Sequence, residues 1–361
     1  MAKHSSGYDY VPDGSADAVC AKGDFVFAAA GLDHGHIFAQ ASGLISAGAA
    51  CKLVWDPDRA KVDEFIKRFP ETRAAASLDE ILDDDEIALV ANASVPADRF
   101  GMGARVLDAE KHFFVDKPPF TTLGQLDAAR RLVRASGKKY MPYYSERIHN
   151  QAAEKANELV KSGAIGRVLQ VLILAPHRLS KPARPAWFFD RERYGGILTD
   201  IGSHQFEQFL EFTGSREAHL NFARVGNMNN PDTPGLQDFG EASLATDTGA
   251  SCYCRVDWFT PDGLPVWGDG RTFILGTEGY IEIRKYVDYS LPGNPSQMLY
   301  ITDKDGTRKI DCREMKFPFF GNFILDILNG TENAMTQEHA FKAAELSMKA
   351  QVLAEEGLEH A

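Results

Sequence analysis

The chain has 361 residues, of which 39 are Lys or Arg and 51 are Asp or Glu, giving a formal net charge of −12. Hydrophobic residues make up 44% and charged residues 25%, which is typical of a globular protein and excludes a disordered or fibrous one. This length suits two domains. The acidic balance disfavours nucleic-acid binding, and no apolar run approaches the roughly 20 residues that a membrane helix needs.

The beginning of the chain and the cysteines favour a cytoplasmic protein. Residues 1–23 lack the continuous apolar stretch of a signal peptide and are interpreted as a polar arm. Cys252 and Cys254 lie too close together for a good disulfide or metal spacing, and five cysteines are an odd and sparse set. We therefore expect free, buried or half-buried thiols in a reducing compartment.

Residues 24–145 alternate short apolar runs with helical stripes. Strands are predicted at residues 25–30, 52–55, 87–92 and 112–115. Helices are predicted at 36–47, around 62–69, after a Ser77 capping box, and from Thr121 or Thr122 to Gly137. Strands and helices that alternate at this spacing indicate a parallel sheet, so we predict an α/β, doubly wound Rossmann domain.

Residues 146–361 contain mostly strands and are predicted to form an α+β domain with a large, open, mostly antiparallel sheet. After a helix at 150–161, strand patterns occupy 167–174, 250–259, 271–275, 280–286 and 297–302. A last helix is predicted after a Thr336 cap, with Phe341, Ala344, Met348 and Val352 on one face.

The turn after the first strand is the candidate dinucleotide site. It reads Ala30-Gly31-Leu32-Asp33-His34-Gly35-His36, with two glycines where the full fingerprint has three. Asp56 ends the second strand, where an acid binds ribose hydroxyls and repels a 2′-phosphate, so NAD is favoured. Arg59 nearby leaves NADP open. The alternative is a structural glycine turn with a helix-capping aspartate.

The same turn contains two histidines and an acid, which are the residue types of a metal site. No Cys and no further suitably spaced His or Glu accompanies Asp33, His34 and His36, and a catalytic metal usually needs three protein ligands. We predict no metal, and we expect these side chains to line the pyrophosphate turn.

Two further motifs have residues suited to proton transfer. Asp116-Lys117-Pro118 follows the 112–115 strand, and a Lys beside a nicotinamide can take a hydroxyl proton. Downstream, Gly195-Gly196 leads into a helical segment in which Asp200 and His204 share a face, so that the carboxylate can orient the imidazole. The alternatives are a surface Lys and an ordinary i,i+4 surface pair.

Together these motifs resemble the glucose–fructose oxidoreductase / inositol dehydrogenase / MocA (Gfo/Idh/MocA) family, over nearly the whole chain. The segments 162–168, 276–282 and 329–340 also fit. Asp116 stands where the family has Glu, and Glu207 where it commonly has Asp.

The resemblance implies a nicotinamide cofactor, a sugar or polyol substrate, and a homodimer or homotetramer formed through the C-terminal sheet. It also implies that Lys117 and His204 transfer the proton, and that Asp200 binds a substrate hydroxyl or orients the base.

The predicted sites follow from the motifs and their neighbours. The catalytic set is Lys117, Asp200 and His204. The cofactor set is Gly31, Leu32, Asp33, His34, Gly35, His36, Asp56, Ser94, Val95, Pro96, Asp116, Lys117 and Ser145. The substrate set is Tyr144, Arg147, His177, Arg178, Trp187, Asp200 and His204. Trp258 and Trp267 flank the 260–270 loop, which is interpreted as a lid or an oligomer contact.

The favoured function is an NAD-dependent oxidoreductase acting on a secondary alcohol of a carbohydrate. One alternative is a lyase or glycosidase that uses tightly bound NAD in a transient oxidation. The other is a non-catalytic cofactor-binding protein, which has no need of Lys117, Asp200 and His204 together.

Overall fold

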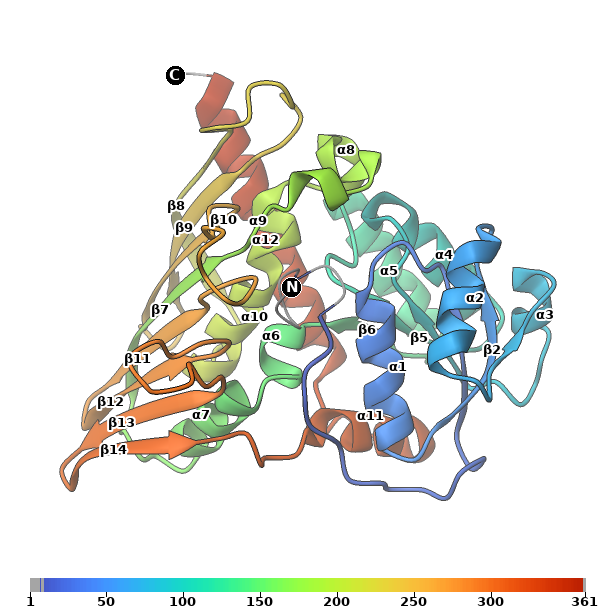
Figure 1. Ribbon diagram of the computed structural model, residues 1–361, viewed down its shortest axis with the longest axis horizontal. Helices are drawn as coiled ribbons and strands as arrows, with labels where there is room; N and C mark the ends of the chain where they lie inside the picture. The colour runs from blue at the N-terminus through green and yellow to red at the C-terminus, as the bar shows by residue number, and fades with distance from the viewer. Residues whose placement is uncertain (1–6, 8–9, 360–361) are drawn as a thin grey trace. The chain divides into compact units, whose positions relative to one another are not determined.

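A computed structural model describes residue 7 and residues 10–359 (Figure 1). The rest of the predicted N-terminal arm, residues 1–6 and 8–9, and residues 360–361 lie outside the described residues. The chain divides into two compact units. Within the described residues, the first unit contains 10–143 and Lys316–Ala340, and the second contains Tyr144–Met315 and 341–359 together with Gly7. Residues 316–340, which the sequence prediction placed in the C-terminal domain, thus pack with the first unit.

The first unit is built on a parallel sheet of six strands in the order β3-β2-β1-β4-β5-β6. The strands are β1 (Val26–Ala30), β2 (Ala50–Trp55), β3 (Arg73–Ala74), β4 (Leu89–Asn92), β5 (His112–Asp116) and β6 (Tyr140–Tyr143). This is the predicted doubly wound Rossmann sheet. Its strand order reverses between β1 and β4, and ligands of such sheets bind outside the carboxyl ends of the strands at that point.

Helices cover both faces of this sheet. They are α1 (His36–Ser46), α2 (Arg59–Arg68), α3 (Leu78–Leu82), α4 (Pro96–Asp108), α5 (Leu123–Ser136) and α11 (Pro318–Asn329). Consecutive strand residues point to opposite faces, and β5 shows this directly. The Phe114 ring packs against Phe323 of α11 at 5.3 Å between centroids, whereas Phe113 packs against Tyr140 at 5.0 Å and lies under Gly103 of α4.

Local capping signals in the sequence are confirmed in this unit. The Ser77 side chain accepts a hydrogen bond from the Glu80 backbone N–H at the start of α3. Thr122 and Gln125 form a reciprocal capping box at the start of α5, which ends at Gly137 in the left-handed conformation.

The second unit contains a sheet of eight strands in the order β14-β13-β12-β11-β7-β10-β9-β8. They are β7 (Val168–Pro176), β8 (Ala218–Gly226), β9 (Phe239–Thr246), β10 (Ser251–Asp257), β11 (Arg271–Gly276), β12 (Gly279–Arg284), β13 (Met298–Asp303) and β14 (Gly306–Asp311). The β7 and β10 pair is parallel and the other pairs are antiparallel, so the sheet is mostly antiparallel as predicted.

Helices cover one face of the second sheet. α10 (Gly202–Thr213) packs on β7 and β10, and α7 (Gln151–Lys161) packs on β12 and β13. On β11, Ile274 is fully buried beneath these helices, whereas Phe273 and Leu275 point the other way and are 37% and 44% exposed. The remaining elements are α6 (Ser145–Ile148), η1 (Lys181–Ala183), η2 (Ala186–Phe189), α8 (Arg191–Tyr194), α9 (Ile197–Asp200) and α12 (Gln337–Glu359).

Two smaller expectations have different outcomes. In α12, Phe341, Ala344 and Met348 are buried as predicted, but Val352 is 46% exposed, so the buried stripe does not extend to it. Cys252 and Cys254 are buried, and all five cysteines, which lie within the described residues, are free thiols. No helix in residues 10–359 is both long enough and apolar enough to span a bilayer.

Candidate functional site

The glycine turn at the end of β1 has room for no side chain at Gly31. Its φ is +76°, and a Cβ atom there would lie 2.6 Å from Asn92 Nδ2 and 2.9 Å from Ser94 Cβ. Asn92 in turn donates from Nδ2 to the Ala30 carbonyl at 2.6 Å. The carboxyl ends of β1 and β4 are therefore tied together, and Gly31 is the residue that allows this close approach.

Asp56, at the end of β2, is buried and supports the turn. Its Oδ2 accepts from the Leu32 backbone N–H at 2.6 Å, and its Oδ1 accepts from the Asp58 N–H at 2.9 Å. The cation nearest this carboxylate is Lys61, whose Nζ lies 3.8 Å from Asp56 Oδ1 and 2.6 Å from Asp33 Oδ1. Lys61 was not predicted, because its partners lie in two other segments of the chain.

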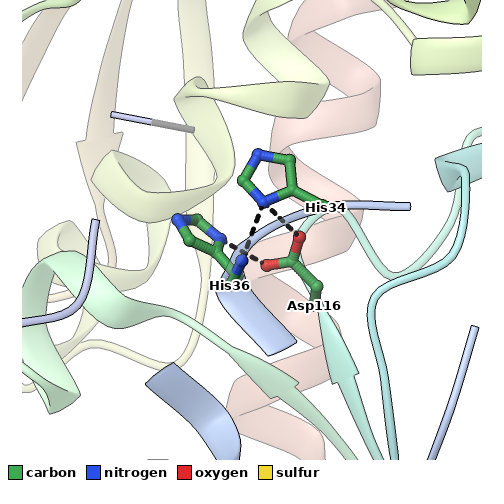
Figure 2. A group of neighbouring side chains, drawn as sticks. All are labelled: His34, His36 and Asp116. Atoms are coloured by element: carbon green, nitrogen blue, oxygen red, sulfur yellow. Dashed lines mark hydrogen bonds and ion pairs between the residues drawn. The ribbon is translucent and has the colours of Figure 1, made fainter. Parts of the chain in front are cut away.

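His34, His36 and Asp116 come together at the carboxyl ends of β1 and β5 (Figure 2). His36 Nδ1 lies 2.8 Å from Asp116 Oδ1, and His34 Nδ1 lies 3.7 Å from Asp116 Oδ2. The His36 backbone N–H donates to His34 Nδ1 at 3.1 Å. Arg99 of α4 donates from Nη2 to Asp116 Oδ2 at 2.9 Å, and both of these side chains are buried.

The charge states of this cluster follow from its partners. Burial alone would raise the pKa of Asp116, but His36 and Arg99 hold that pKa well below its ordinary value, so the carboxylate is ionised. Burial, reinforced by the neighbouring His36, lowers the pKa of His34 well below its ordinary value, so His34 is neutral.

The cluster also has the geometry from which metal sites are built. The ligating atoms of His34, His36 and Asp116 lie within 4.8 Å of one another. However, the Arg99 guanidinium already neutralises the carboxylate, and His34 Nδ1 already accepts a backbone N–H. These contacts favour a hydrogen-bonded network over a cation, and the absence of a metal stays a prediction.

Lys117 follows β5 directly and is 6% exposed. Its backbone N–H donates to Asp116 Oδ1 at 2.8 Å, and the Lys117–Pro118 peptide bond is cis. Arg99 Nη1 donates to the Pro118 carbonyl at 3.0 Å. Arg99 thus fixes the Asp116-Lys117-Pro118 motif from α4, and no local pattern in the sequence signals this long-range role.

The second motif, in the second unit, begins with a pair of left-handed glycines. Gly195 and Gly196 have φ values of 90° and 88°, and a Cβ at Gly196 would lie 2.3 Å from Gln351 Cδ. This turn starts α9, which ends at Asp200, and α10 follows with His204 in its first turn. Asp200 is half-buried and His204 is 3% exposed.

Arg147, predicted to contact substrate, lies in a buried ion cluster. Its Nε donates to Glu207 Oε1 at 2.6 Å and its Nη1 to Glu154 Oε1 at 3.3 Å. Burial raises the pKa of Glu154 to about 7, against the lowering effect of Arg147. The contacts of Arg147 are those of a residue that holds α10, α6 and α7 together, and its role toward substrate stays a prediction.

A second buried ion pair joins Lys285 to Glu146, the residue that precedes Arg147. Lys285 donates from Nζ to Glu146 Oε2 at 3.0 Å, and Gln205 donates to the same oxygen at 2.9 Å. His177 Nε2 lies 3.8 Å from Glu146 Oε1. Burial opposes ionisation of Glu146, but Lys285 and His204 lower its pKa to about 2. Neither Glu146 nor Lys285 was predicted, although both are charged residues next to apolar strand patterns.

Aromatic rings surround His177. They belong to Trp267 at 4.5 Å and Trp258 at 5.4 Å between centroids, and both indoles are buried. Arg178 donates to the carbonyls of Pro261 and Leu264 and so holds the 260–270 loop. Trp187 is half-buried in η2.

The structure divides the predicted sets between the units. Lys117 and the cofactor set lie in the first unit, apart from Ser145, which opens α6 in the second unit. The whole substrate set, including Asp200 and His204, lies in the second unit.

Two family descriptions match this chain in order. "Oxidoreductase family, NAD-binding Rossmann fold" matches residues 29–144, and "GFO/IDH/MocA C-terminal domain" matches residues 153–282. The chain belongs to the Gfo/Idh/MocA oxidoreductase family. Its NAD-binding domain contains the glycine turn and Lys117, and the matched C-terminal domain contains Asp200 and His204.

Known relatives of this Gfo/Idh/MocA chain include a protein from Erwinia carotovora atroseptica SCRI1043, provisionally described as an oxidoreductase. It is 47% identical, with a TM-score of 0.88 over 92% of this chain and 99% of that one. The uncharacterized oxidoreductase YhhX of Escherichia coli K12 is 27% identical over 48% of this chain and 49% of its own length. D-xylose dehydrogenase of Paenarthrobacter nicotinovorans is 23% identical over 41% of this chain and 39% of its own length. This chain thus spans half or less of these two curated relatives.

The residues at the turn fit a dinucleotide. Gly31 allows β1 to approach β4, and the Gly35 N–H at the start of α1 has no hydrogen-bond partner within residues 10–359. An amide at a helix N-terminus is a suitable donor to a pyrophosphate. Asp33, at the position of the fingerprint's second glycine, is neutralised by Lys61 at 2.6 Å, which reduces its repulsion of the phosphates.

Proposed function

We propose that this Gfo/Idh/MocA oxidoreductase is an NAD-dependent dehydrogenase of a secondary alcohol on a sugar, polyol or related carbohydrate. The observation that carries the proposal is the position of Lys117, which is buried and follows β5 in the NAD-binding Rossmann domain. Ligands of such sheets bind at the carboxyl ends of the strands. The similarity to D-xylose dehydrogenase supports a carbohydrate as the substrate class.

In this proposal each motif has a defined role. The bound nicotinamide supplies the hydride acceptor. Lys117 and His204 are the groups that take the hydroxyl proton, and Asp200 binds a neighbouring hydroxyl or orients the imidazole. Lys61 beside Asp56 leaves room for NADP as well as NAD, because an ammonium group offsets the repulsion between the carboxylate and a 2′-phosphate.

We also propose that copies of the chain associate through the outer face of the second sheet. On this face four large apolar side chains are exposed in the part of the chain that the structure describes: Phe222, Phe273, Leu275 and Tyr280. Leu275 and Tyr280 face each other across the β11–β12 pair, with Phe273 on the same face, and exposed apolar side chains grouped in this way are typical of an interface.

The test of the enzymatic proposal follows NADH absorbance while purified protein is incubated with NAD and a panel of D-xylose, D-glucose, myo-inositol and glycosides. We expect net NADH from at least one sugar or polyol. Lys117→Ala should lower kcat by about 10²-fold to 10⁴-fold, because a positioned proton acceptor contributes that much, while the Kd for NAD changes little. Lys67→Ala removes an exposed lysine of the same unit and serves as the control.

Other outcomes separate the alternatives. Product without NADH indicates a transient oxidation cycle, and NAD binding without turnover of any compound indicates a non-catalytic protein. Near-normal turnover by the Lys117→Ala variant rules out the assignment of Lys117.

A further inference from the structure

The two histidines of the glycine turn differ in which ring nitrogen carries the proton. His34 Nδ1 accepts a backbone N–H from His36, so in neutral His34 the proton is on Nε2. His36 Nδ1 faces an ionised carboxylate at 2.8 Å, so Nδ1 carries a proton and donates it to Asp116. Neutral His36 therefore has an unprotonated Nε2, which is a base.

The Nε2 atom of His36 can accept a proton from a bound molecule. Figure 2 shows this atom on the side of the ring turned away from Asp116. It makes no hydrogen bond to any other residue that the structure describes, and the side chain is 12% exposed. A carboxylate that fixes one imidazole nitrogen and leaves the other unprotonated is the arrangement of a general base.

The surroundings favour proton transfer over cation binding. Asp116 of β5 is hydrogen-bonded to His36, and the rings of His34 in the turn and Tyr143 of β6 contact its imidazole. Arg99 of α4 and Lys117 after β5 lie against Asp116 on its other sides. Arg99 neutralises the carboxylate, and Asp116 Oδ1 is shared by His36 Nδ1 and the Lys117 backbone N–H. The base and Lys117 are thus held by the same oxygen atom.

We propose that Asp116 and His36 form a general-base dyad of the first unit, in which His36 Nε2 accepts the proton released by the reacting hydroxyl, directly or through the Lys117 amine. This inference rests on the proposed dehydrogenase function. The substrate O–H bond breaks and its proton forms an N–H bond at Nε2. The O–H electron pair becomes the second bond of the carbonyl, and the C–H pair leaves as hydride to NAD⁺. Asp116 stabilises the imidazolium, whose partly exposed ring returns the proton to solvent.

The decisive variant is His36→Asn, because an Asn side-chain amide can still donate to Asp116 in place of Nδ1 but has no base in place of Nε2. We expect kcat to fall by about 10²-fold or more, with the Kd for NAD within about threefold of the unaltered protein. The acid limb of the kcat/KM profile should also be lost. His112→Asn is the matched control: His112 lies on β5, the strand of Asp116, its Nδ1 accepts a backbone N–H, and its replacement should leave the profile unchanged.

A second measurement needs neither substrate nor a folded variant. In the unaltered protein labelled with ¹⁵N-histidine, long-range proton–nitrogen spectra should show His36 protonated at Nδ1 and His34 protonated at Nε2. The opposite tautomer at His36 overturns the dyad.

The remaining outcomes also decide the question. A His36→Asn variant that loses NAD affinity but keeps its pH profile makes His36 a cofactor contact. Stoichiometric zinc in the unaltered protein, absent from the variant, makes the cluster a metal site. If His36→Asn keeps full activity while Lys117→Ala is inactive, only the dyad is rejected. If the unaltered protein turns over none of the compounds, the dehydrogenase function itself is rejected.

Discussion

Glu146 is ionised although its side chain is buried. The side chain is 3% exposed, and its Oε1 has no hydrogen-bond partner among residues 10–359. Burial works against its ionisation, but Lys285 and His204 lower its pKa from 4.5 to about 2. An acid whose pKa is lower in the folded state stabilises the fold above its unfolded pKa. The contribution of Glu146 is therefore present above about pH 4.5 and is lost as the pH falls from 4.5 toward 2.

Replacing one member of the Glu146–Lys285 ion pair should destabilise the fold more than replacing both members together. We expect Glu146→Gln and Lys285→Met each to lower the free energy of unfolding at pH 7 by about 3–5 kcal/mol, because each leaves a buried partner uncompensated. The double variant should lose less than the sum of the two. Chemical denaturation at pH 7 and pH 4 measures both effects, and a strictly additive double variant would contradict the pairing.

Glu154 provides a control, because its folded-state pKa is shifted in the opposite direction to that of Glu146. Its folded-state pKa of about 7 lies above its ordinary value of 4.5, so its contribution to stability falls as the pH rises from 4.5 to 7. In Glu154→Gln this dependence should disappear, whereas the acid-side loss that arises from Glu146 should remain.

At the scale of elements, the outer face of the second sheet has a measurable consequence. Phe273 and Leu275 alternate on β11 with the buried Thr272 and Ile274, so both point away from the helices. We expect the combined Phe273→Lys and Leu275→Lys variant to lower the mass measured by light scattering to that of a single chain, because like charges oppose association of the two faces. Its unfolding midpoint as a monomer should change little, and an unchanged oligomeric mass would place the interface elsewhere.

Most elements were predictable because their patterns are local. The strand runs of β1, β4 and β5 and the Thr122 cap needed only neighbouring residues. β14 was not predicted, because nearly all of its residues are exposed and it has no apolar alternation. α4 was also missed: it contains Gly101 and Gly103, which weaken a helix, and Gly103 is needed there to make room for Tyr140 and Phe113.

The candidate site shows the same division. Lys117, Asp200 and His204 stand in recognisable motifs, and His36 lies in the glycine turn. Arg99 and Lys285 act on residues that are 17 and 139 positions away, and nothing in their own neighbourhood indicates those partners. Long-range ion pairs depend on the tertiary fold and leave no periodic trace in the sequence.

At the scale of the whole molecule, the first unit is completed by a distant segment. Phe320 of α11 is fully buried, and a Cβ at Gly43 of α1 would lie 2.2 Å from its ring. We expect Phe320→Ala to lower the free energy of unfolding by about 3–5 kcal/mol through the cavity that it leaves. NAD affinity should fall with it, because α1 begins at the glycine turn.

Thermal unfolding and NAD titration by fluorescence measure these two effects. Leu328→Ala changes the same helix at a side chain that is 51% exposed, and should remain within about 0.5 kcal/mol of the unaltered protein. A Phe320→Ala variant with weakened stability and full NAD affinity would show that α1 is held in place without α11.

Because residues 316–340 pack with the first unit, they constrain the order in which the two units can fold during synthesis. Domains generally fold as units during synthesis, yet α11 is translated only after β7–β14. Until then α1 has no ring to cover Gly43, and its apolar face is open to other hydrophobic surfaces. The nucleotide-binding half is thus the first to begin and cannot be completed until β7–β14 of the other unit have been made.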